Sequence, residues 1–166
     1  MGQNSPWEDA IEIAEGVRQT KSLHLQFVLT VRADCILTLG GGSITDACKL
    51  SALLLENVPS PIMREAIPAL INPMNSPPPS HVKSPSLPMI FVPTTLSAGE
   101  YHSHAGCLDH EAGIKKQFSY PGLVPRWIIC DAELASLTPE WVWLSTGMPQ
   151  MDKDFDLRSP GRGSRL

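Results

Sequence analysis

The residues best suited to chemistry form the run Gly40-Gly41-Gly42-Ser43, directly after the apolar stretch 33–39. Glycines let a backbone approach a bulky anion closely, and a helix that opens at Ser43 would aim free N–H groups and its positive dipole end at that anion. Ser43 would cap this helix or donate to a phosphate oxygen. The run matches neither GxGxxG nor the Walker pattern, in which Lys follows the last glycine. Two interpretations stay open: a phosphate or dinucleotide site, and a tight strand–helix turn without a ligand.

A second polar segment begins with Thr94 and Thr95, after the apolar run 87–92. Hydroxyls and small residues at the carboxyl end of a buried strand suit contact with a nucleotide in the crevice of a sheet. Clusters of Ser, Thr and Gly also form ordinary turns, so this segment alone does not distinguish a site from a turn.

A third group, His102, His104, Cys107 and His110, has the spacing HxHx2Cx2H. Structural zinc sites use paired ligands of wider separation, and His102 and His104 would share one face of a strand. We therefore favour ordinary solvated or hydrogen-bonded imidazoles over a zinc site. The neighbouring Lys115 and Lys116 are interpreted, from the residues alone, as solvated charges. Four cysteines without close pairing are typical of reduced thiols in a cytosol-like compartment.

The elements around these residues follow from apolar periodicity and turn signals. Helices are predicted over 7–17, 43–55 and 141–147, with one helical turn at 63–66. Strands are predicted at 33–39, 87–92, 101–106, 117–118 and 127–130. Ten of the 16 prolines fall between Pro59 and Pro93, which favours an extended surface connection over 58–88. Strand, glycine turn and helix form half of a βαβ unit, so an α/β fold with a parallel sheet is expected.

Composition narrows the class of protein further. The chain has 166 residues and a formal net charge of −4, which favours one globular domain and disfavours nucleic acid as a partner. No apolar run is long enough to cross a membrane, and the amino terminus has no signal-peptide pattern. A cytoplasmic protein is the expectation.

Three segments together resemble one known family. The run ILTLGGGSITDACK fits the pattern GGGSxxDxxK of the iron-type alcohol dehydrogenases, a superfamily that includes the maleylacetate reductases. The run VPTTLSAGEYHSHAG is similar to the family's PTT loop and the hairpin after it, and residues 115–148 resemble the stretch leading to its second domain. The three motifs occur in family order.

The resemblance implies a Rossmann-like parallel sheet with flanking helices that binds NAD or NADP, followed in the family by an all-helical domain that this sequence lacks. The α/β domain is expected over 5–147, incomplete at its amino end, with an insertion at 20–31 and a divergent, disordered tail over 148–166. The resemblance places the pyrophosphate at the glycine turn, the ribose and nicotinamide at Thr94 and Thr95, and the adenosine end near Lys115 or Lys116. It has Asp46 and Lys49 tie the first helical turn to its surroundings. The expected cofactor-binding residues are Gly40, Gly41, Gly42, Ser43, Asp46, Thr94, Thr95 and Lys116.

The implied activity is hydride transfer between a nicotinamide and an alcohol or ketone, with no nucleic acid or membrane partner. The family's first metal-ligand positions are occupied by Pro149 and Lys153, and neither can hold a cation, so the family's Fe²⁺ or Zn²⁺ is not expected here. Because substrate and mechanism depend on the family's all-helical domain, which supplies the second wall of the active-site cleft, substrate turnover by this chain alone is not expected. Two alternatives stay open: an inactive nucleotide-binding or interaction remnant, and a metal-free enzyme similar to maleylacetate reductase. Self-association into a homo-oligomer is a further expectation.

Overall fold

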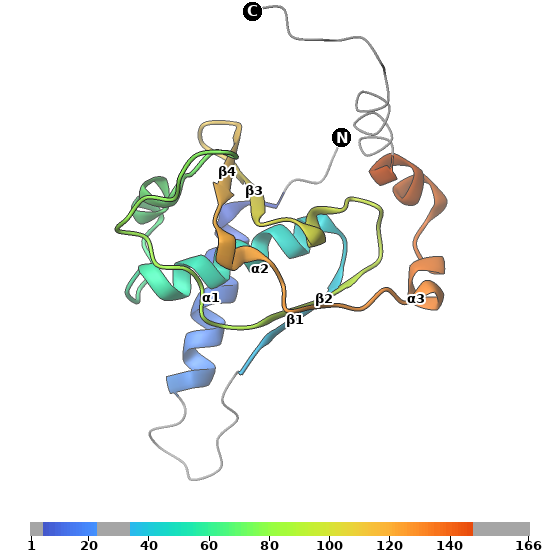
Figure 1. The fold of residues 1–166 in the computed structure, drawn as a ribbon, viewed down its shortest axis with the longest axis horizontal. Coiled ribbons are helices and arrows are strands. Elements are labelled where there is room, and N and C mark those ends of the chain that lie inside the picture. The colour runs from blue at the N-terminus through green and yellow to red at the C-terminus, as the bar shows by residue number, and fades with distance from the viewer. Residues whose placement is uncertain (1–4, 23–33, 148–166) are drawn as a thin grey trace, which may run out of the picture.

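The computed structural model describes residues 5–22 and 34–147, which fold into an α/β arrangement (Figure 1). Its helices and strands in chain order are α1 (Trp7–Ser22), β1 (Ile36–Gly40), α2 (Gly42–Asn57), β2 (Met89–Pro93), β3 (His104–Asp109), β4 (Ile114–Ser119), β5 (Trp127–Ile128) and α3 (Ala132–Ser136). Short 3-10 helices occupy Arg64–Leu70, Gly99–Tyr101 and Pro121–Leu123, and residues 140–147 are helical.

The expected parallel sheet is confirmed. Its strand order is β1-β2-β5, and β1 runs parallel to β2 with a register from Ile36↔Met89 to Gly40↔Pro93. Alternate residues of β1 are buried, as in a strand with one covered face. Both long strands therefore end at the same edge, where the glycine turn and Thr94 begin.

Helix α2 lies between the sheet and the rest of the molecule. On the sheet side, its Cys48 and Ala52 pack with Ile36, Met89 and Phe91. Its opposite side joins a larger core shared with α1 and the β3–β4 hairpin, which includes Trp7, Ala10, Ala14, Leu50, Leu53, Leu54, Ile67, Cys107, Phe118 and Tyr120. Nine of the ten residues from Thr45 to Leu54 are buried, so this part of the helix is covered on nearly all sides.

Helix α1 is longer than the sequence predicts. The predicted end at residue 17 is wrong, because the helix continues to Ser22. Arg18, in this additional part, donates from Nη2 to the carbonyl oxygens of Val58 and, at 3.1 Å, of Leu55. A cation that satisfies the last carbonyls of α2 stabilises that helix end. The expected insertion at 20–31 falls mainly on residues 23–33, which lie outside the described residues, and so does the tail 148–166.

The predicted strand at 101–106 starts too early and ends too early. Tyr101 belongs to a 3-10 helix, and β3 begins only at His104. The cause is the backbone at Ala98, whose left-handed φ of 56° turns the chain before it can extend. Strands β3 and β4 then form an antiparallel hairpin, of which only 117–118 were predicted in β4.

The proline-rich connection holds more structure than the predicted turn at 63–66. Its 3-10 helix spans Arg64–Leu70, includes Pro68 and buries Ile67 and Leu70 in the larger core. Arg64 fixes this segment, because its guanidinium contacts Glu8 of α1 at 3.3 Å and Asp109 of β3 at 2.7 Å. The connection is therefore packed against the domain over part of its length.

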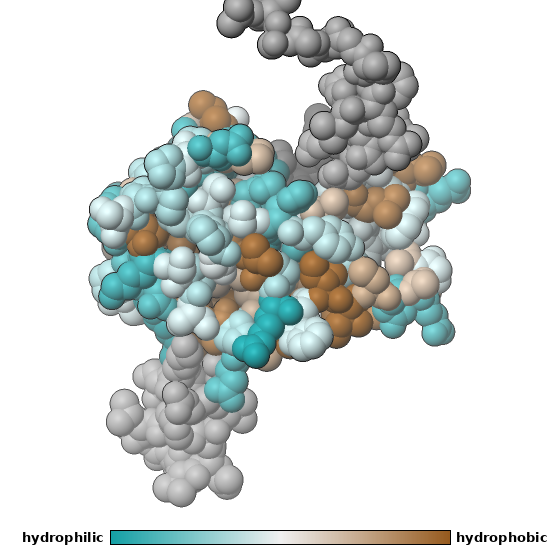
Figure 2. Space-filling view, in the orientation of Figure 1, coloured by the Kyte–Doolittle hydropathy of each residue, from teal (hydrophilic) through white to brown (hydrophobic). Residues whose placement is uncertain are grey.

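The face of the sheet opposite α2 is open to solvent and apolar. Leu37 and Leu39 of β1 are 62% and 53% exposed, and Trp127 and Ile129 at β5 are 63% and 50% exposed. In Figure 2 a brown hydrophobic patch lies where these strands run in Figure 1. Among the described residues, no helix is long and apolar enough to cross a membrane.

Candidate functional site

The glycine turn joins the end of β1 to the start of α2. Gly40 has a φ of 151°, a conformation that favours glycine, and a Cβ there would lie 2.5 Å from Ile44 Cδ1. Gly41 is the N-cap of α2, without a side-chain capping bond, and its carbonyl accepts from the amides of Ile44 and Thr45. The predicted helix start and cap at Ser43 are therefore wrong. The turn has already closed one residue earlier, and the Ser43 carbonyl accepts from Ser5 Oγ.

The loop after β2 lies directly against this turn. The Thr94 amide donates to the Gly40 carbonyl at 3.0 Å. A Cβ on Gly41 would be 2.9 Å from Thr95 Cγ2, and a Cβ on Gly42 would be 2.5 Å from Ser97 Oγ. The two motifs, 54 residues apart when Gly40 and Thr94 are compared, thus meet at one corner of the sheet. Larger residues in the turn would push the loop away.

Thr95 is the unsatisfied polar group of this corner. Its Oγ1 is buried and has no hydrogen-bond partner. This oxygen lies against Gly41, 3.0 Å from the point where a Cβ on that residue would stand. A buried hydroxyl without a partner costs about 1–3 kcal/mol, so it is a candidate for contact with a bound group. The predicted residues Gly40, Gly41, Gly42, Thr94 and Thr95 are therefore brought together, and Ser43 follows in the first turn of α2.

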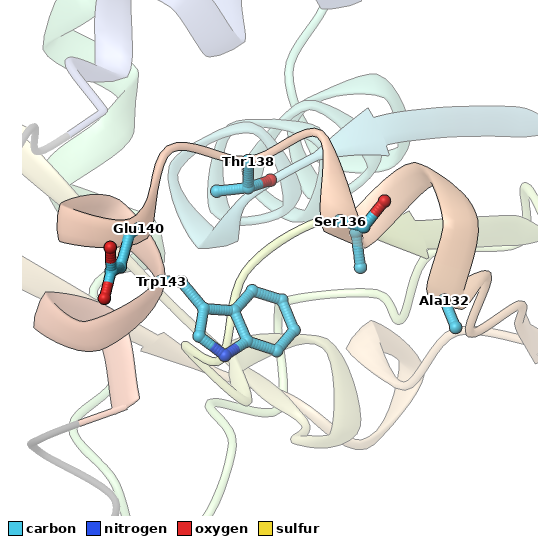
Figure 3. Close-up of a pocket in the computed structure, with 6 residues that line it drawn as sticks. Ala132, Ser136, Thr138, Glu140 and Trp143 are labelled. Carbon is cyan, nitrogen blue, oxygen red and sulfur yellow. The ribbon is translucent and has the colours of Figure 1, made fainter.

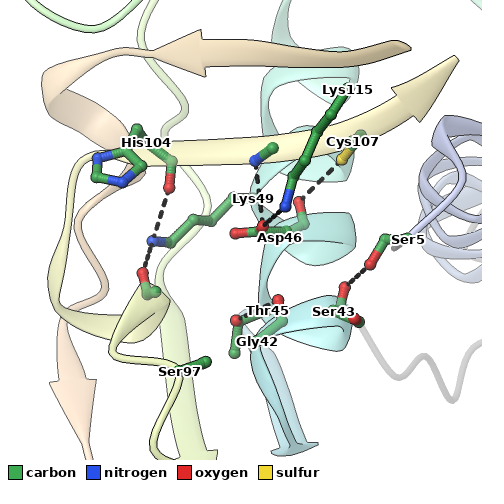
Figure 4. Close-up of polar contacts among 12 residues, drawn as sticks. Ser5, Gly42, Ser43, Thr45, Asp46, Lys49, Ser97, His104, Cys107 and Lys115 are labelled. Carbon is green, nitrogen blue, oxygen red and sulfur yellow. Dashed lines mark hydrogen bonds and ion pairs between the residues drawn. The ribbon is translucent and has the colours of Figure 1, made fainter. Parts of the chain in front are cut away.

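Asp46 and Lys49 lie one helical turn apart on α2 and both contact the segment that follows the loop (Figure 4). Asp46 Oδ2 accepts from the Gly106 amide at 3.1 Å. Burial raises the pKa of Asp46, and the Gly106 bond opposes that shift. Lys49 Nζ donates to main-chain carbonyls of the 99–104 segment, and burial lowers its pKa to about 8. Both side chains have protein partners, and the predicted contact of Asp46 with a cofactor stays a prediction.

The two lysines of β4 have different surroundings. Lys115 is half-exposed and reaches Asp46, with Nζ 3.8 Å from Oδ2. The interpretation of Lys115 as a purely solvated charge is therefore wrong: its stem crosses Gly106, where a Cβ would lie 2.2 Å from Lys115 Cε. Lys116 pairs with Cys107 across the hairpin. Its predicted contact with the adenosine end of a cofactor stays a prediction.

Sequence reasoning missed Glu100 and Ser97. Glu100 is fully buried in the 3-10 helix, and its Oε1 accepts from Ser97 Oγ at 3.1 Å. A local signal was present, since Ser97 and Glu100 have the three-residue spacing of a capping box. Burial of Glu100 depends on the contact of the loop with α2, which the spacing does not reveal.

The histidine-rich segment does not gather into one site. The rings of His102 and His104 stack on each other at a centroid distance of 4.9 Å. The buried Cys107 thiol donates to the Asp46 carbonyl, with 3.7 Å between Sγ and the oxygen. Burial raises the pKa of this thiol. In the described part of the chain, no three His, Cys, Asp or Glu side chains are grouped so that they could hold a metal ion. All four cysteines are free thiols.

A cavity of about 560 Å³ lies beside the same loop, between α3 and the helix at 140–147 (Figure 3). Its lining includes Thr138, Ser136, Glu140 and Trp143. Thr138 Oγ1 donates to the Thr94 carbonyl at 2.7 Å, which fixes the cavity next to the loop. Asp131 caps α3 by accepting from the amides of Glu133 and Leu134, as its sequence position predicts.

Fold and corner together define the class of protein. It is an α/β protein of the Rossmann-like type, in which a glycine turn and a hydroxyl-bearing loop meet outside the carboxyl ends of neighbouring parallel strands. The model of one family, "Iron-containing alcohol dehydrogenase", matches residues 10–132. The chain belongs to this family of dehydrogenases, as its three sequence motifs predict.

Known relatives agree with this assignment. The chain is 36% identical over 150 residues to "Dehydrogenase ALT3" of Alternaria alternata, a match that covers 90% of this chain and 35% of the relative. Among solved structures, sulfoacetaldehyde reductase of Bifidobacterium kashiwanohense in complex with NAD+ has a TM-score of 0.65 at 23% identity, covering 89% of this chain and 34% of that one. Maleylacetate reductase of Rhizobium sp. strain MTP-10005 has a TM-score of 0.55 at 22% identity, covering 90% and 31%. The chain thus spans about a third of the length of these proteins.

Proposed function

We propose that this chain is the nicotinamide-cofactor-binding part, over residues 5–147, of an NAD(P)-dependent oxidoreductase that acts on an alcohol or ketone. The observation that carries the proposal is the unpartnered Thr95 hydroxyl, buried against Gly41 at the amino end of α2. A helix start with no side-chain cap and a neighbouring unsatisfied hydroxyl suit a negatively charged ligand. The NAD+ complex of the sulfoacetaldehyde reductase, which has the same fold, supports the choice of ligand.

The residues present fit the cofactor at this corner. The amides of the first turn of α2 would hold the pyrophosphate, next to the Thr95 and Ser97 side chains that lie against Gly41 and Gly42. Thr95 Oγ1 would donate to the cofactor. Thr94 is held in place by the hydrogen bond from its amide to the Gly40 carbonyl. When bound, the nicotinamide supplies hydride transfer, and the protein supplies binding and orientation.

A metal does not fit the described residues, because they hold no suitable group of three ligands. The positions at which the family binds its ion, Pro149 and Lys153, lie outside the described residues, and neither residue type is a metal ligand. We therefore derive no step through Fe²⁺ or Zn²⁺. Reduction of a substrate without a metal, as proposed from the resemblance to maleylacetate reductases, remains the variant of this function.

The second candidate is a nucleotide-binding remnant without activity of its own. It is favoured by the Thr95 and Ser97 side chains, which already lie in the space beside Gly41 and Gly42. Under this proposal the purified chain binds NAD(P)H weakly or not at all and gives no alcohol-dependent NADH production. Such production, if lost in Gly41→Ala, would overturn it.

Cofactor binding is tested by titrating the purified chain with NADH and NADPH and following energy transfer from its tryptophans. Two of them, Trp127 and Trp141, are exposed and lie in the carboxyl-terminal part of the domain. We expect saturable binding that Gly41→Ala weakens by about tenfold, or about 1.4 kcal/mol, because the new methyl displaces Thr95. The matched control is Gly16→Ala in α1, where a Cβ meets nothing within 4 Å. Equal affinity in both variants would contradict the proposed site.

A further inference from the structure

Lys49 is a fully buried cation that binds three main-chain carbonyls of one segment. Its Nζ lies 2.5 Å from the Gly99 oxygen, 2.6 Å from that of His102 and 3.2 Å from that of His104. An ammonium group has three N–H donors, so these carbonyls can use all of them. Figure 4 shows the lysine extending from α2 towards this segment.

Burial of a charged ammonium group is unfavourable in free energy unless all of its N–H donors are used. The carboxylates of Asp46 and Glu100 lower that cost, since both favour the charged form of Lys49. The Phe91 ring adds a cation–π contact at 5.8 Å. Lys49 is therefore fixed in place from α2, β2 and the 3-10 helix at once.

The segment that Lys49 binds continues the loop that closes on the glycine turn. Glu100, next to Gly99, accepts from the Ser97 hydroxyl through both carboxylate oxygens, at 3.1 and 3.3 Å. Ser97 Oγ in turn occupies the space beside Gly42, as Thr95 does beside Gly41. The position of Thr95 and Ser97 thus depends on where residues 99–104 are held.

We propose that Lys49 is a positioning residue for the cofactor corner: through the carbonyls of Gly99, His102 and His104 it holds residues 94–104 against the glycine turn. The inference rests on the proposed function for its effect on cofactor affinity, and on the geometry alone for its effect on the loop. Without Lys49 the loop moves away from Gly41 and Gly42, while the sheet and α1 keep their packing.

The chain contains a matched control at the other end of α2. Arg18 also donates to three main-chain carbonyls, those of Leu54, Leu55 and Val58, far along the helix from the glycine turn. Removal of either cation leaves three main-chain carbonyls without that donor. Of these two cations, Lys49 is the one that connects α2 to the loop that carries Thr95.

The experiment compares Lys49→Met and Arg18→Met with the unchanged chain, by amide hydrogen exchange and by NADH titration. We expect exchange at 94–104, relative to the amides of Leu53 and Leu54, to rise about tenfold or more in Lys49→Met alone. We expect the NADH dissociation constant to rise by a similar factor in Lys49→Met and to stay within about twofold in Arg18→Met. Equal changes in the two variants, in exchange or in affinity, would mean a general structural role and would overturn the proposal.

Two outcomes separate this inference from the proposed function. If the unchanged chain binds no NADH, the proposed function fails, and the exchange comparison still decides whether Lys49 holds the loop. If Lys49→Met does not fold, amide hydrogen exchange of the unchanged chain tests the proposal. We then expect the amides of Tyr101 and His102 to exchange as slowly as those of α2. Exchange as fast as in an unstructured loop would overturn the proposal.

Discussion

At the scale of single residues, the three consecutive glycines of the turn serve two different purposes. Gly40 provides a backbone conformation, whereas Gly41 and Gly42 provide room for Thr95 and Ser97. The sequence predicted these glycines either beside a phosphate or in a tight turn without a ligand, and it did not predict that side chains of a distant loop occupy the space. That difference arises because the loop partner lies more than 50 residues away in the chain.

The backbone role of Gly40 can be separated from simple flexibility. Gly40→Ala is expected to lower the free energy of unfolding by about 1–3 kcal/mol, because its φ of 151° is strained for alanine and its methyl would meet Ile44 at 2.5 Å. Gly16→Ala, within α1, should instead raise it by about 0.5–1 kcal/mol. Urea unfolding followed by circular dichroism measures both, and a Gly40→Ala protein as stable as the unchanged chain would contradict this reading of the turn.

The buried lysine predicts a pH dependence of stability. The pKa of Lys49 is lowered from 10.5 to about 8 in the folded chain, so between these values the unfolded state binds more protons than the folded state. The free energy of unfolding of the unchanged chain should therefore rise from pH 8 to 10 relative to that of Lys49→Met. Denaturation of both proteins at several pH values gives this difference. A difference that is constant or falls over this range would show that Lys49 is not desolvated as described.

At the scale of elements, α2 organises the molecule. Its amino end meets the glycine turn, its middle holds the loop and the hairpin through Lys49 and Asp46, and its carboxyl end is capped by Arg18 of α1. The strand–turn–helix unit and the parallel sheet were predictable, since apolar runs and glycines are local signals. The hairpin and the 3-10 helices were predicted in part or missed, because a left-handed Ala98 and tertiary contacts decide them.

Arg64 connects three elements, and its two kinds of ion pair should differ in energy. Arg64→Met is expected to lower the free energy of unfolding by about 1–3 kcal/mol, because Asp109, whose side chain is 14% exposed, loses its partner at 2.7 Å. Glu111→Gln removes a pair to the same guanidinium, but Glu111 is 79% exposed, so the change should stay below about 0.5 kcal/mol. Thermal unfolding of the two variants measures this, and equal effects would contradict the assigned roles.

At the scale of the whole molecule, the described domain has one covered and one open sheet face. Leu37 and Leu39 on β1 and Trp127 at β5 are exposed on the open face, and apolar patches of this kind favour association. The chain spans about a third of the length of its relatives. The sequence predicted the domain type and the cofactor class through motif order, and it contained no signal for the substrate.

The open face leads to a prediction about association. The purified chain is expected to sediment as species larger than a monomer, and Leu37→Lys with Leu39→Lys should shift it towards the monomer, because charged side chains oppose burial of that face. Sedimentation velocity at several concentrations measures both. A sharp monomeric boundary for the unchanged chain would contradict the prediction.

The central claim is that the glycine turn at the start of α2 receives the pyrophosphate of a nicotinamide cofactor. The most direct measurement is the change in amide NMR shifts of the full chain on addition of NADH. We predict that the largest changes fall on Gly41, Gly42 and Thr95, saturate with concentration and need about tenfold more NADH to saturate in Gly41→Ala. Saturable changes centred elsewhere, such as on the histidines of 102–110, or no changes at millimolar NADH, would contradict it.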